Sequence, residues 1–253
     1  MRIELEKPQI EEEQPAIPQP AVKFSDMSGK KKAEYIWDYY KWWFIGGIIA
    51  IIAIVTFVRD YRENSKPYYL CVEMLNTYFG YDKSYTLYDD FVNAAGIDLS
   101  KEQFRFGTET TLATDSFDTT MIAYQQRLIA GYEAQDIDVV IGPKNIIEGP
   151  ANCNCYADFE KILPADLLNE LNDRDYELYY FDPSADLIEE DEGEDAKPYC
   201  AGVYLDNCSY LNNMGEHGAY PEAETEDDRP VFTIAANSLR MDHAIEFLRF
   251  LIQ

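Results

Sequence analysis

The chain has 253 residues, and its 47 acidic side chains against 21 basic ones give a formal net charge of −26. Residues 1–41 are nearly neutral, so almost all of this negative charge belongs to the longer part that follows. Such a surface repels nucleic acid and anionic lipid, and it disfavours an anionic substrate unless a local basic pocket holds it. We therefore expect no nucleic-acid partner.

Residues 1–29 are interrupted by four prolines, carry an acidic run at 11–13 and hold few apolar residues. This composition predicts a disordered tail. Residues 30–41 follow as a collar rich in lysine and aromatic residues, and we expect the collar to continue as a helix into the next segment.

Residues 42–58, WWFIGGIIAIIAIVTFV, contain no charged side chain. As a helix they extend about 26 Å at about 1.5 Å per residue, which suffices for a slightly thin hydrocarbon core. The alternatives are a buried core helix and a cleaved secretory signal. A core helix normally has a polar face, which this segment lacks. A secretory signal rarely has about 40 residues before its apolar stretch, and it normally ends in a small-residue cleavage site, which is absent here. The sequence therefore predicts an uncleaved anchor whose partner is the lipid bilayer.

The flanks of this apolar segment predict its orientation. Five lysines lie between residue 23 and its start, whereas two arginines and one lysine follow it closely, and an excess of cations marks the cytoplasmic side. We expect residues 1–29 in the cytoplasm, residues 59–66 as a polar stalk and residues 67–253 as one extracellular domain. Aromatic rings favour the headgroup region, and the four candidates at the first interface are Tyr39, Tyr40, Trp42 and Trp43.

The exterior part begins with alternating strand and helix patterns. Residues 68–75, 103–110 and 137–142 are β-branched, aromatic or alternating in polarity, which predicts three strands. Between them, apolar side chains recur at helical spacing over residues 82–95 and 116–134. A β-α-β-α-β series of this kind predicts a parallel sheet with helices on its faces.

Further helices and strands are predicted in the rest of the exterior part. Gly96 is expected to end the first of the two helices, because glycine readily adopts a positive φ. We expect a helix over 164–172, strands over 199–205 and 231–236, a final helix over 240–252, and acidic loops at 184–196 and 216–229. The predicted fold class is α/β: a single transmembrane helix followed by an open, mostly parallel sheet flanked by helices.

All five cysteines follow the apolar segment; they are Cys71, Cys153, Cys155, Cys200 and Cys208. An oxidising compartment would allow pairs to form, and the odd number leaves at least one cysteine without a partner in the chain. Cys200 and Cys208 flank a short strand and turn, and they are the first candidate disulfide. Cys153 and Cys155 lie too close for an ordinary disulfide, and with only two histidines in the chain we expect no metal site.

Four segments of the exterior part resemble the extracellular solute-binding proteins of bacterial ABC importers, the type 2 periplasmic-binding class. They are DIDVVIG (136–142), YADFEKILP (156–164), PYCAGVYLDN (198–207) and PVFTIAANSLRMDHAIEFLRFLIQ (230–253). The resemblance implies a periplasmic-binding-protein-like sheet with a ligand cleft at the ends of its strands. Members of this class usually clamp the ligand between two lobes and carry a lipidated cysteine. This chain has the length of one lobe and its own helical anchor, and no tryptophan follows the apolar segment to stack on a sugar.

In an open α/β sheet, ligands bind outside the carboxyl ends of the strands. We therefore expect ligand-binding residues directly after the first three predicted strands and after the last. They are Asn76, Thr77 and Tyr78, then Thr110 and Thr111, then Gly142, Pro143 and Lys144, and finally Asn237 and Ser238. The alternative is that Asn237 or Ser238 caps the final helix, and that Asn76 and Thr77 begin an ordinary loop.

The sequence contains no serine nucleophile elbow, no zinc-binding H-E-x-x-H motif and no phosphate-binding loop, so we expect neither an enzyme nor a cofactor. The acidic run 189–195 lacks the spacing of a calcium loop and is predicted to be a solvated loop. The leading hypothesis is a surface-exposed, single-pass protein that binds a small polar molecule or a partner protein. The alternative is an interaction or assembly module of the cell envelope in which the ligand cleft has been lost.

Overall fold

The computed structural model describes residues 27–78, 81–112, 119–182, 197–214 and 218–253. These residues form two compact units, which divide between Ser65 and Lys66. The predicted cytoplasmic tail lies almost wholly outside the described residues, and so does the predicted acidic loop at 184–196.

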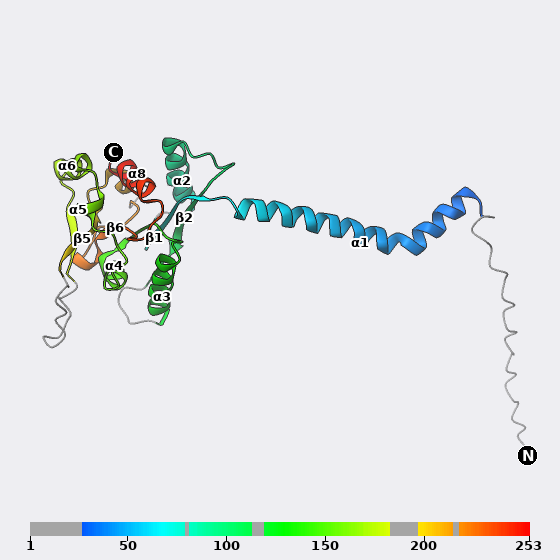
Figure 1. Ribbon diagram of the computed structural model, residues 1–253, viewed down its shortest axis with the longest axis horizontal. Helices are drawn as coiled ribbons and strands as arrows, with labels where there is room; N and C mark the ends of the chain where they lie inside the picture. Colours follow the sequence, from blue (N-terminus) through cyan, green and yellow to red (C-terminus); the bar gives the residue numbers. More distant parts are fainter. Residues whose placement is uncertain (1–26, 79–80, 113–118, 183–196, 215–217) are drawn as a thin grey trace, which may run out of the picture. The chain divides into compact units, whose positions relative to one another are not determined.

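Helix α1 (Gly29–Asn64) makes up the described part of the first unit and contains the whole apolar segment 42–58 (Figure 1). None of its residues is buried, so it is no core helix of this chain. The hydroxyl of Thr56 lies 3.0 Å from the carbonyl oxygens of both Ile52 and Ala53, so the one side-chain hydroxyl of the segment is satisfied within the helix. This exposed apolar helix is consistent with a signal anchor or a single membrane span.

The predicted collar and most of the predicted stalk belong to the same helix α1. The four expected interface residues lie exposed on it, and the most accessible is Trp43, at 79%. Two tyrosine rings of the collar, Tyr39 and Tyr40, meet edge to face with centroids 5.0 Å apart. These aromatic side chains are therefore exposed at the N-terminal end of the apolar segment, directly after the lysine-rich collar.

The second unit is an α/β domain built on one sheet of six strands. The strands are β1 (Tyr68–Leu75), β2 (Gln103–Thr110), β3 (Val139–Pro143), β4 (Leu178–Phe181), β5 (Tyr199–Tyr204) and β6 (Pro230–Ile234). The helices are α2 (Tyr81–Ala95), α3 (Thr119–Glu133), α4 (Lys144–Ala151), α5 (Phe159–Ile162), α6 (Ala165–Asp173), α7 (Ser209–Asn212) and α8 (Met241–Ile252), with a 3₁₀ turn η2 (Glu226–Asp228). The predicted β-α-β-α-β series is confirmed as β1-α2-β2-α3-β3, and Gly96 follows α2 with a φ of +67°.

The strand order across the sheet is β2-β1-β3-β6-β5-β4. Strand β1 pairs in parallel with β2 and β3, whereas the other three pairings are antiparallel. The prediction of a mostly parallel sheet is therefore wrong, and the sheet is mixed. A parallel neighbour needs a connection that carries the chain back across the sheet. The segment from β5 to β6 instead stays at the edge where β3 ends, so β6 starts there, with Pro230 opposite Pro143.

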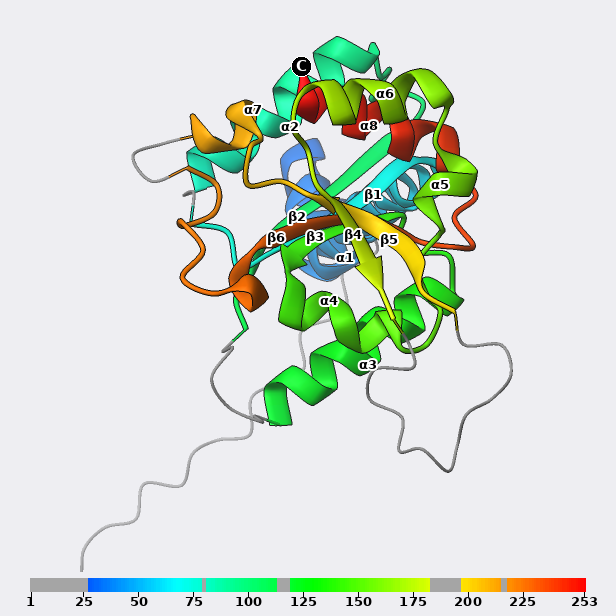
Figure 2. The same cartoon turned by 90° about the vertical axis from the view of Figure 1, so that its left-hand side faces the viewer.

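Helices cover both faces of the sheet, with α2, α6 and α8 on one face and α3 and α4 on the other (Figure 2). Successive side chains of a strand alternate between the faces. Leu70, Val72 and Met74 of β1 enter the core under α2 and α8, and Leu75 enters the core under α3 and α4. Glu73, between Val72 and Met74, therefore projects toward the face that α3 covers.

The strand order reverses at β1. Helix α2 leads the chain from β1 outward to β2, and α3 leads it back past β1 to β3. In a sheet of this kind the crevice outside the ends of the two strands at the reversal, here β1 and β3, is the usual ligand position. This crevice is the first place to look for a site.

The expected disulfide between Cys200 and Cys208 is not present, because all five cysteines are free. Both thiols are buried, and each lies against a carbonyl group of its own. The sulfur of Cys200 is 3.6 Å from the oxygen of Gly202, and the sulfur of Cys208 is 3.1 Å from that of Leu251. The two cysteines thus serve as small buried side chains of the core.

Candidate functional site

One edge of the sheet gathers most of the predicted ligand-binding residues. The carboxyl ends of β1, β2, β3 and β5 meet there with the beginnings of β6 and β4. The structure therefore places seven of the predicted residues, together with Pro143, at this carboxyl edge, in the last residues of β2 and β3 or directly after β1, β2 and β3. They are Asn76, Thr77, Tyr78, Thr110, Thr111, Gly142 and Lys144.

Asn237 and Ser238 lie at the opposite edge, because β6 runs antiparallel to β3. There the amide of Asn237 donates to the carbonyl oxygen of Tyr132 at 2.7 Å, and the hydroxyl of Ser238 donates to the buried carboxylate of Asp138 at 2.6 Å. Asp138 also accepts a 2.6 Å ion pair from Arg240. Asn237 thus fixes the segment before α8 to α3, Ser238 fixes it to Asp138, and neither residue lies at the carboxyl edge.

Asn76 and Thr77 fasten the end of β1 to β2. The side chain of Asn76 exchanges two hydrogen bonds with the backbone of Leu112, at 2.6 and 2.9 Å, and its φ is +55°, in a region that asparagine tolerates. The hydroxyl of Thr77 donates to the carbonyl oxygen of Thr108 at 2.9 Å. The polar groups expected to meet a ligand thus already have partners, as the loop alternative proposed.

The chain itself fills the crevice between β1 and β3. The backbone N–H of Tyr78 donates to the carbonyl oxygen of Ala219 at 2.8 Å, and the hydroxyl of Tyr220 donates to that of Ile141 at 3.1 Å. Tyr220 is only 7% exposed, and burial raises the pKa of its phenol far above the ordinary value. Behind it the strands are tightly packed, since a Cβ at Gly142 would lie 3.0 Å from that of Leu75. A side chain of the domain thus occupies the usual ligand position.

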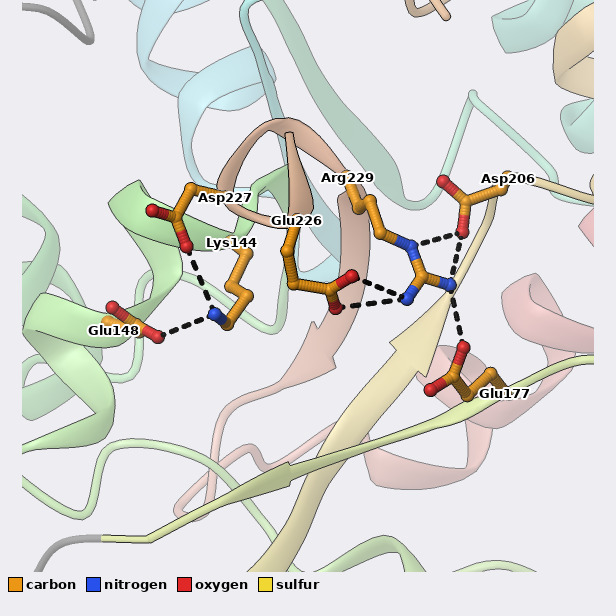
Figure 3. Close-up of polar contacts among 7 residues, drawn as sticks. All are labelled: Lys144, Glu148, Glu177, Asp206, Glu226, Asp227 and Arg229. Atoms are coloured by element: carbon orange, nitrogen blue, oxygen red, sulfur yellow. Dashed lines mark hydrogen bonds and ion pairs between the residues drawn. The ribbon is translucent and has the colours of Figure 1, made fainter. Parts of the chain in front are cut away.

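Further along the same edge, Arg229 gathers three carboxylates (Figure 3). Its guanidinium donates to Asp206 at 2.7 and 2.9 Å, to Glu226 at 3.0 Å and to Glu177 at 2.9 Å. The group also lies 3.7 Å from the ring centroid of Tyr204, a favourable cation–π distance. This fork ties the segment before β6 to the end of β5 and the start of β4. No motif in the sequence points to Arg229, because the carboxylates that it contacts lie up to 52 residues away in the chain.

Lys144, one of the predicted ligand-binding residues, is neutralised in the same region (Figure 3). Its ammonium lies 3.1 Å from Asp227 and 3.4 Å from Glu148. One lysine and one arginine here face five carboxylates, and both cations form ion pairs with them. We interpret this cluster as a structural staple of the edge.

A cavity of about 470 Å³ opens at the end of β2, between α2 and α3. It is lined by Glu73, Ser84, Tyr85, Tyr88, Phe106, Gly107, Thr108, Thr110 and Arg127. We call it the Glu73 pocket. Of the predicted ligand-binding residues it contains Thr110 alone. An adjoining cavity of about 380 Å³ shares Glu73 and Arg127 and adds Arg105.

Glu73 reaches the pocket because the residue opposite it on β2 is glycine. The register pairs Glu73 with Gly107, and a Cβ on Gly107 would come within 2.6 Å of a Glu73 carboxylate oxygen. The side chain of Glu73 is half-buried, and it makes no hydrogen bond or ion pair within the described part of the chain. Burial raises the pKa of this carboxyl, while Arg105 and Arg127 oppose that shift.

The two arginines near Glu73 are not held by it. Arg127 is exposed on α3, its guanidinium lies 5.7 Å from the ring centroid of Tyr124, and it forms no ion pair with any described residue. Arg105 donates to the carbonyl oxygen of Asp136, but its buried Nε has no hydrogen-bond partner in the described residues. A carboxylate and two guanidinium groups with unused capacity thus converge on adjoining cavities.

The sequence did hold one signal for this site. Glu73 is the single charged residue of YYLCVEML, a segment otherwise suited to a buried strand. A charged side chain is rarely buried unless it is paired, so an unpaired one in such a strand is a candidate functional group.

The Glu73 pocket brings together one carboxylate, one guanidinium group, hydroxyls and aromatic rings, and the adjoining cavity adds the guanidinium group of Arg105. Within the described ranges, no group of three or more histidine, cysteine, aspartate or glutamate side chains could hold a metal ion. No protein-family model, no curated protein and no solved structure matches the chain.

Proposed function

We propose that the chain is a single-pass membrane protein whose α/β domain lies outside the cell and recognises a small polar ligand in the Glu73 pocket. The observation that carries this proposal is the half-buried Glu73 carboxylate, which faces a cavity of about 470 Å³ and has no partner among the described residues. Cavities of about 300 to 1,000 Å³ with a few convergent polar groups are typical small-molecule sites. Binding without catalysis is the proposed activity.

The membrane orientation belongs to the same proposal. Helix α1 is long, apolar and exposed, and lysines are more frequent before its apolar segment than after it. That bias favours the amino terminus in the cytoplasm and residues 67–253 outside, tethered to the bilayer through residues 42–58. The resemblance to bacterial solute-binding proteins agrees with an exterior binding domain, here with its own anchor.

A second function is favoured by one observation, the occupation of the crevice between β1 and β3 by Tyr220. A domain that has lost the usual ligand position is suited to act as an interaction or assembly module that contacts another protein of the cell envelope. The first proposal places a small ligand in the Glu73 pocket, and the second places a partner protein on the surface of the domain.

A ligand screen on the full chain in lipid nanodiscs tests the first proposal. Saccharides, amino acids, nucleosides and polyamines would be screened by ligand-observed NMR against the wild type and the Thr108→Trp variant, which fills the pocket with a large side chain. We expect at least one compound whose signal is present with the wild type and lost with the variant. Silence across the panel, with a stable partner captured by crosslinking on whole cells, would favour the interaction module instead.

A further inference from the structure

We infer that the ligand of the Glu73 pocket is a small zwitterion, which places its cationic group on Glu73 and its anionic group on Arg127. This inference rests on the proposed function, since it names the class of ligand for the same pocket. It follows from the charges that line the two adjoining cavities and from the contacts that these charges lack.

The anionic half of the site is Glu73. Its carboxylate is half-buried over Gly107 and accepts no hydrogen bond within the described part of the chain. A desolvated carboxylate without a partner is unfavourable, and a ligand ammonium with its three donors supplies what is missing. Burial raises the pKa of this carboxyl, Arg105 and Arg127 partly offset that rise, and a ligand cation on Glu73 would favour its ionised form further.

The cationic half of the site is Arg127, which lines both cavities. Its guanidinium is exposed and forms no ion pair with a described residue, so its paired N–H donors are available to a carboxylate or a similar oxyanion. Arg105, which lines the adjoining cavity with Arg127, adds a buried Nε that has no hydrogen-bond partner among the described residues. Tyr85, Tyr88 and Phe106 supply apolar walls for the remainder of the ligand.

Electrostatics separates a zwitterion from the other ligand classes. A ligand with only negative charge is repelled by the acidic domain and by Glu73 itself, and one with only positive charge faces two arginines. A neutral sugar would leave Glu73 and Arg127 desolvated without opposite charges. A molecule with one charge of each sign satisfies both groups and meets no net repulsion.

The test uses matched probes on the full chain in nanodiscs. Glycine, leucine and phenylalanine would each be titrated as the free amino acid, the amide, the N-acetyl derivative and the doubly blocked N-acetyl amide, by isothermal calorimetry and ligand-observed NMR. We expect at least one free amino acid to bind, and each blocked end to weaken its binding at least about tenfold, because each removes one charge-assisted contact.

Variants assign the two charges to residues. The Glu73→Gln variant is expected to bind the free amino acid only as tightly as the wild type binds its N-acetyl derivative. The Arg127→Gln variant is expected to bind the free amino acid only as tightly as the wild type binds its amide. Glu222→Gln, which removes an exposed carboxylate from a different cavity, is the matched control and is expected to change nothing. Thermal unfolding of each variant checks that the domain remains folded.

Different results would overturn the zwitterionic ligand and the proposed ligand-binding function. Equal binding of the blocked and free forms, or binding of a saccharide alone that Thr108→Trp abolishes, would overturn the zwitterion and leave the pocket as a ligand site. The absence of any binding that depends on Thr108 would overturn both. Binding of a free amino acid that neither Glu73→Gln nor Arg127→Gln weakens would place the zwitterion elsewhere on the domain.

Discussion

The hydroxyl of Tyr220 donates a 3.1 Å hydrogen bond to the carbonyl oxygen of Ile141, across the crevice where β1 and β3 end. A buried ring of the chain therefore occupies the position at which an open α/β sheet usually binds its ligand. The Glu73 carboxylate, which has no partner among the described residues, lies one strand further out, where it reaches over Gly107 of the edge strand β2. Because Tyr220 occupies the usual ligand position and Glu73 lies at the neighbouring edge of the sheet, we propose recognition in the Glu73 pocket.

The first prediction concerns the stability supplied by Tyr220. Tyr220→Ala is expected to lower the free energy of unfolding by about 3 to 5 kcal/mol, since it removes a buried aromatic ring and leaves a cavity. Tyr220→Phe keeps the ring and loses only the hydrogen bond to Ile141, which is worth about 1 kcal/mol. Urea denaturation of the full chain in detergent micelles, followed by circular dichroism, measures both values. A loss below about 1 kcal/mol for Tyr220→Ala would show that the ring does not fill the crevice.

The second prediction concerns the pH dependence produced by Glu73. Because burial raises the pKa of this carboxyl in the folded state, ionisation disfavours folding, and stability falls as the pH rises from the unfolded pKa, about 4.3, through the folded pKa. Glu73→Gln removes this titration. The variant is expected to be more stable than the wild type at pH 7 by a few tenths to about 1 kcal/mol, and equally stable below about pH 4.

Urea denaturation at a series of pH values measures this difference. The matched control is Glu222→Gln, which alters an exposed carboxylate and is expected to have the stability of the wild type at pH 7. A Glu73→Gln variant that is less stable than the wild type at pH 7 would mean that the carboxylate has a stabilising partner in the fold. That result would remove the main support for a ligand at this position.

The third prediction concerns the fork of Arg229. Arg229→Met is expected to lower the free energy of unfolding at pH 7 by about 2 to 3 kcal/mol, because Asp206, Glu226 and Glu177 then face one another without a cation. Burial opposes a low pKa at Glu226, but the hydroxyl of Tyr204 and the guanidinium of Arg229 bring its pKa below the ordinary value.

The lowered pKa of Glu226 sets the pH window of this effect. Its contribution to stability is present above the unfolded pKa, about 4.3, and is lost as the pH falls through the folded pKa. The difference between wild type and Arg229→Met is therefore expected to narrow below about pH 4, which a pH series of urea denaturation measures. A difference that widens in acid would contradict the ion-pair account of this cluster.

The fourth prediction concerns the cysteines and the orientation of the chain. Cys153 is exposed, whereas burial raises the pKa of the half-buried Cys155 to about 11 and that of the buried Cys200 to about 12. A membrane-impermeant maleimide on intact cells is expected to label Cys153 quickly and Cys155 slowly, and Cys153→Ser should abolish the fast phase. Labelling only after permeabilisation would place the domain in the cytoplasm. Fewer than five thiols in a denatured, unreduced sample would reveal a disulfide.

Much of the fold could be predicted from the sequence where one periodicity dominates. The strands at 68–75 and 103–110 and the amphipathic helix α8 were predicted within a residue or two of their observed bounds. Helix α4 was missed because KNIIEGPA carries Gly149 and Pro150, and β4 because LYYF is too short to show a pattern. The direction of β6 depends on where the chain returns to the sheet, which no local pattern encodes.

The candidate site was predicted only in part, for a related reason. The rule that ligands bind at the carboxyl ends of strands selected Thr110, which lines the Glu73 pocket, but it also selected Asn76 and Thr77, whose polar groups are used within the fold. Whether a polar side chain is free for a ligand depends on partners far away in sequence. The Glu73 carboxylate has room to reach the pocket because Gly107 lies opposite it, a pairing that requires the sheet register.

The most direct test is hydrogen–deuterium exchange of the full chain in nanodiscs, with and without the compound or partner found to bind. If recognition occurs in the Glu73 pocket, binding protects amides of the edge strand β2, residues 103–110, and of the facing turns of α2 and α3. Segment 218–230 and the end of β3 remain unchanged, because Tyr220 already fills that crevice. Protection confined to 218–230 and 141–144, with β2 unaffected, would contradict the account.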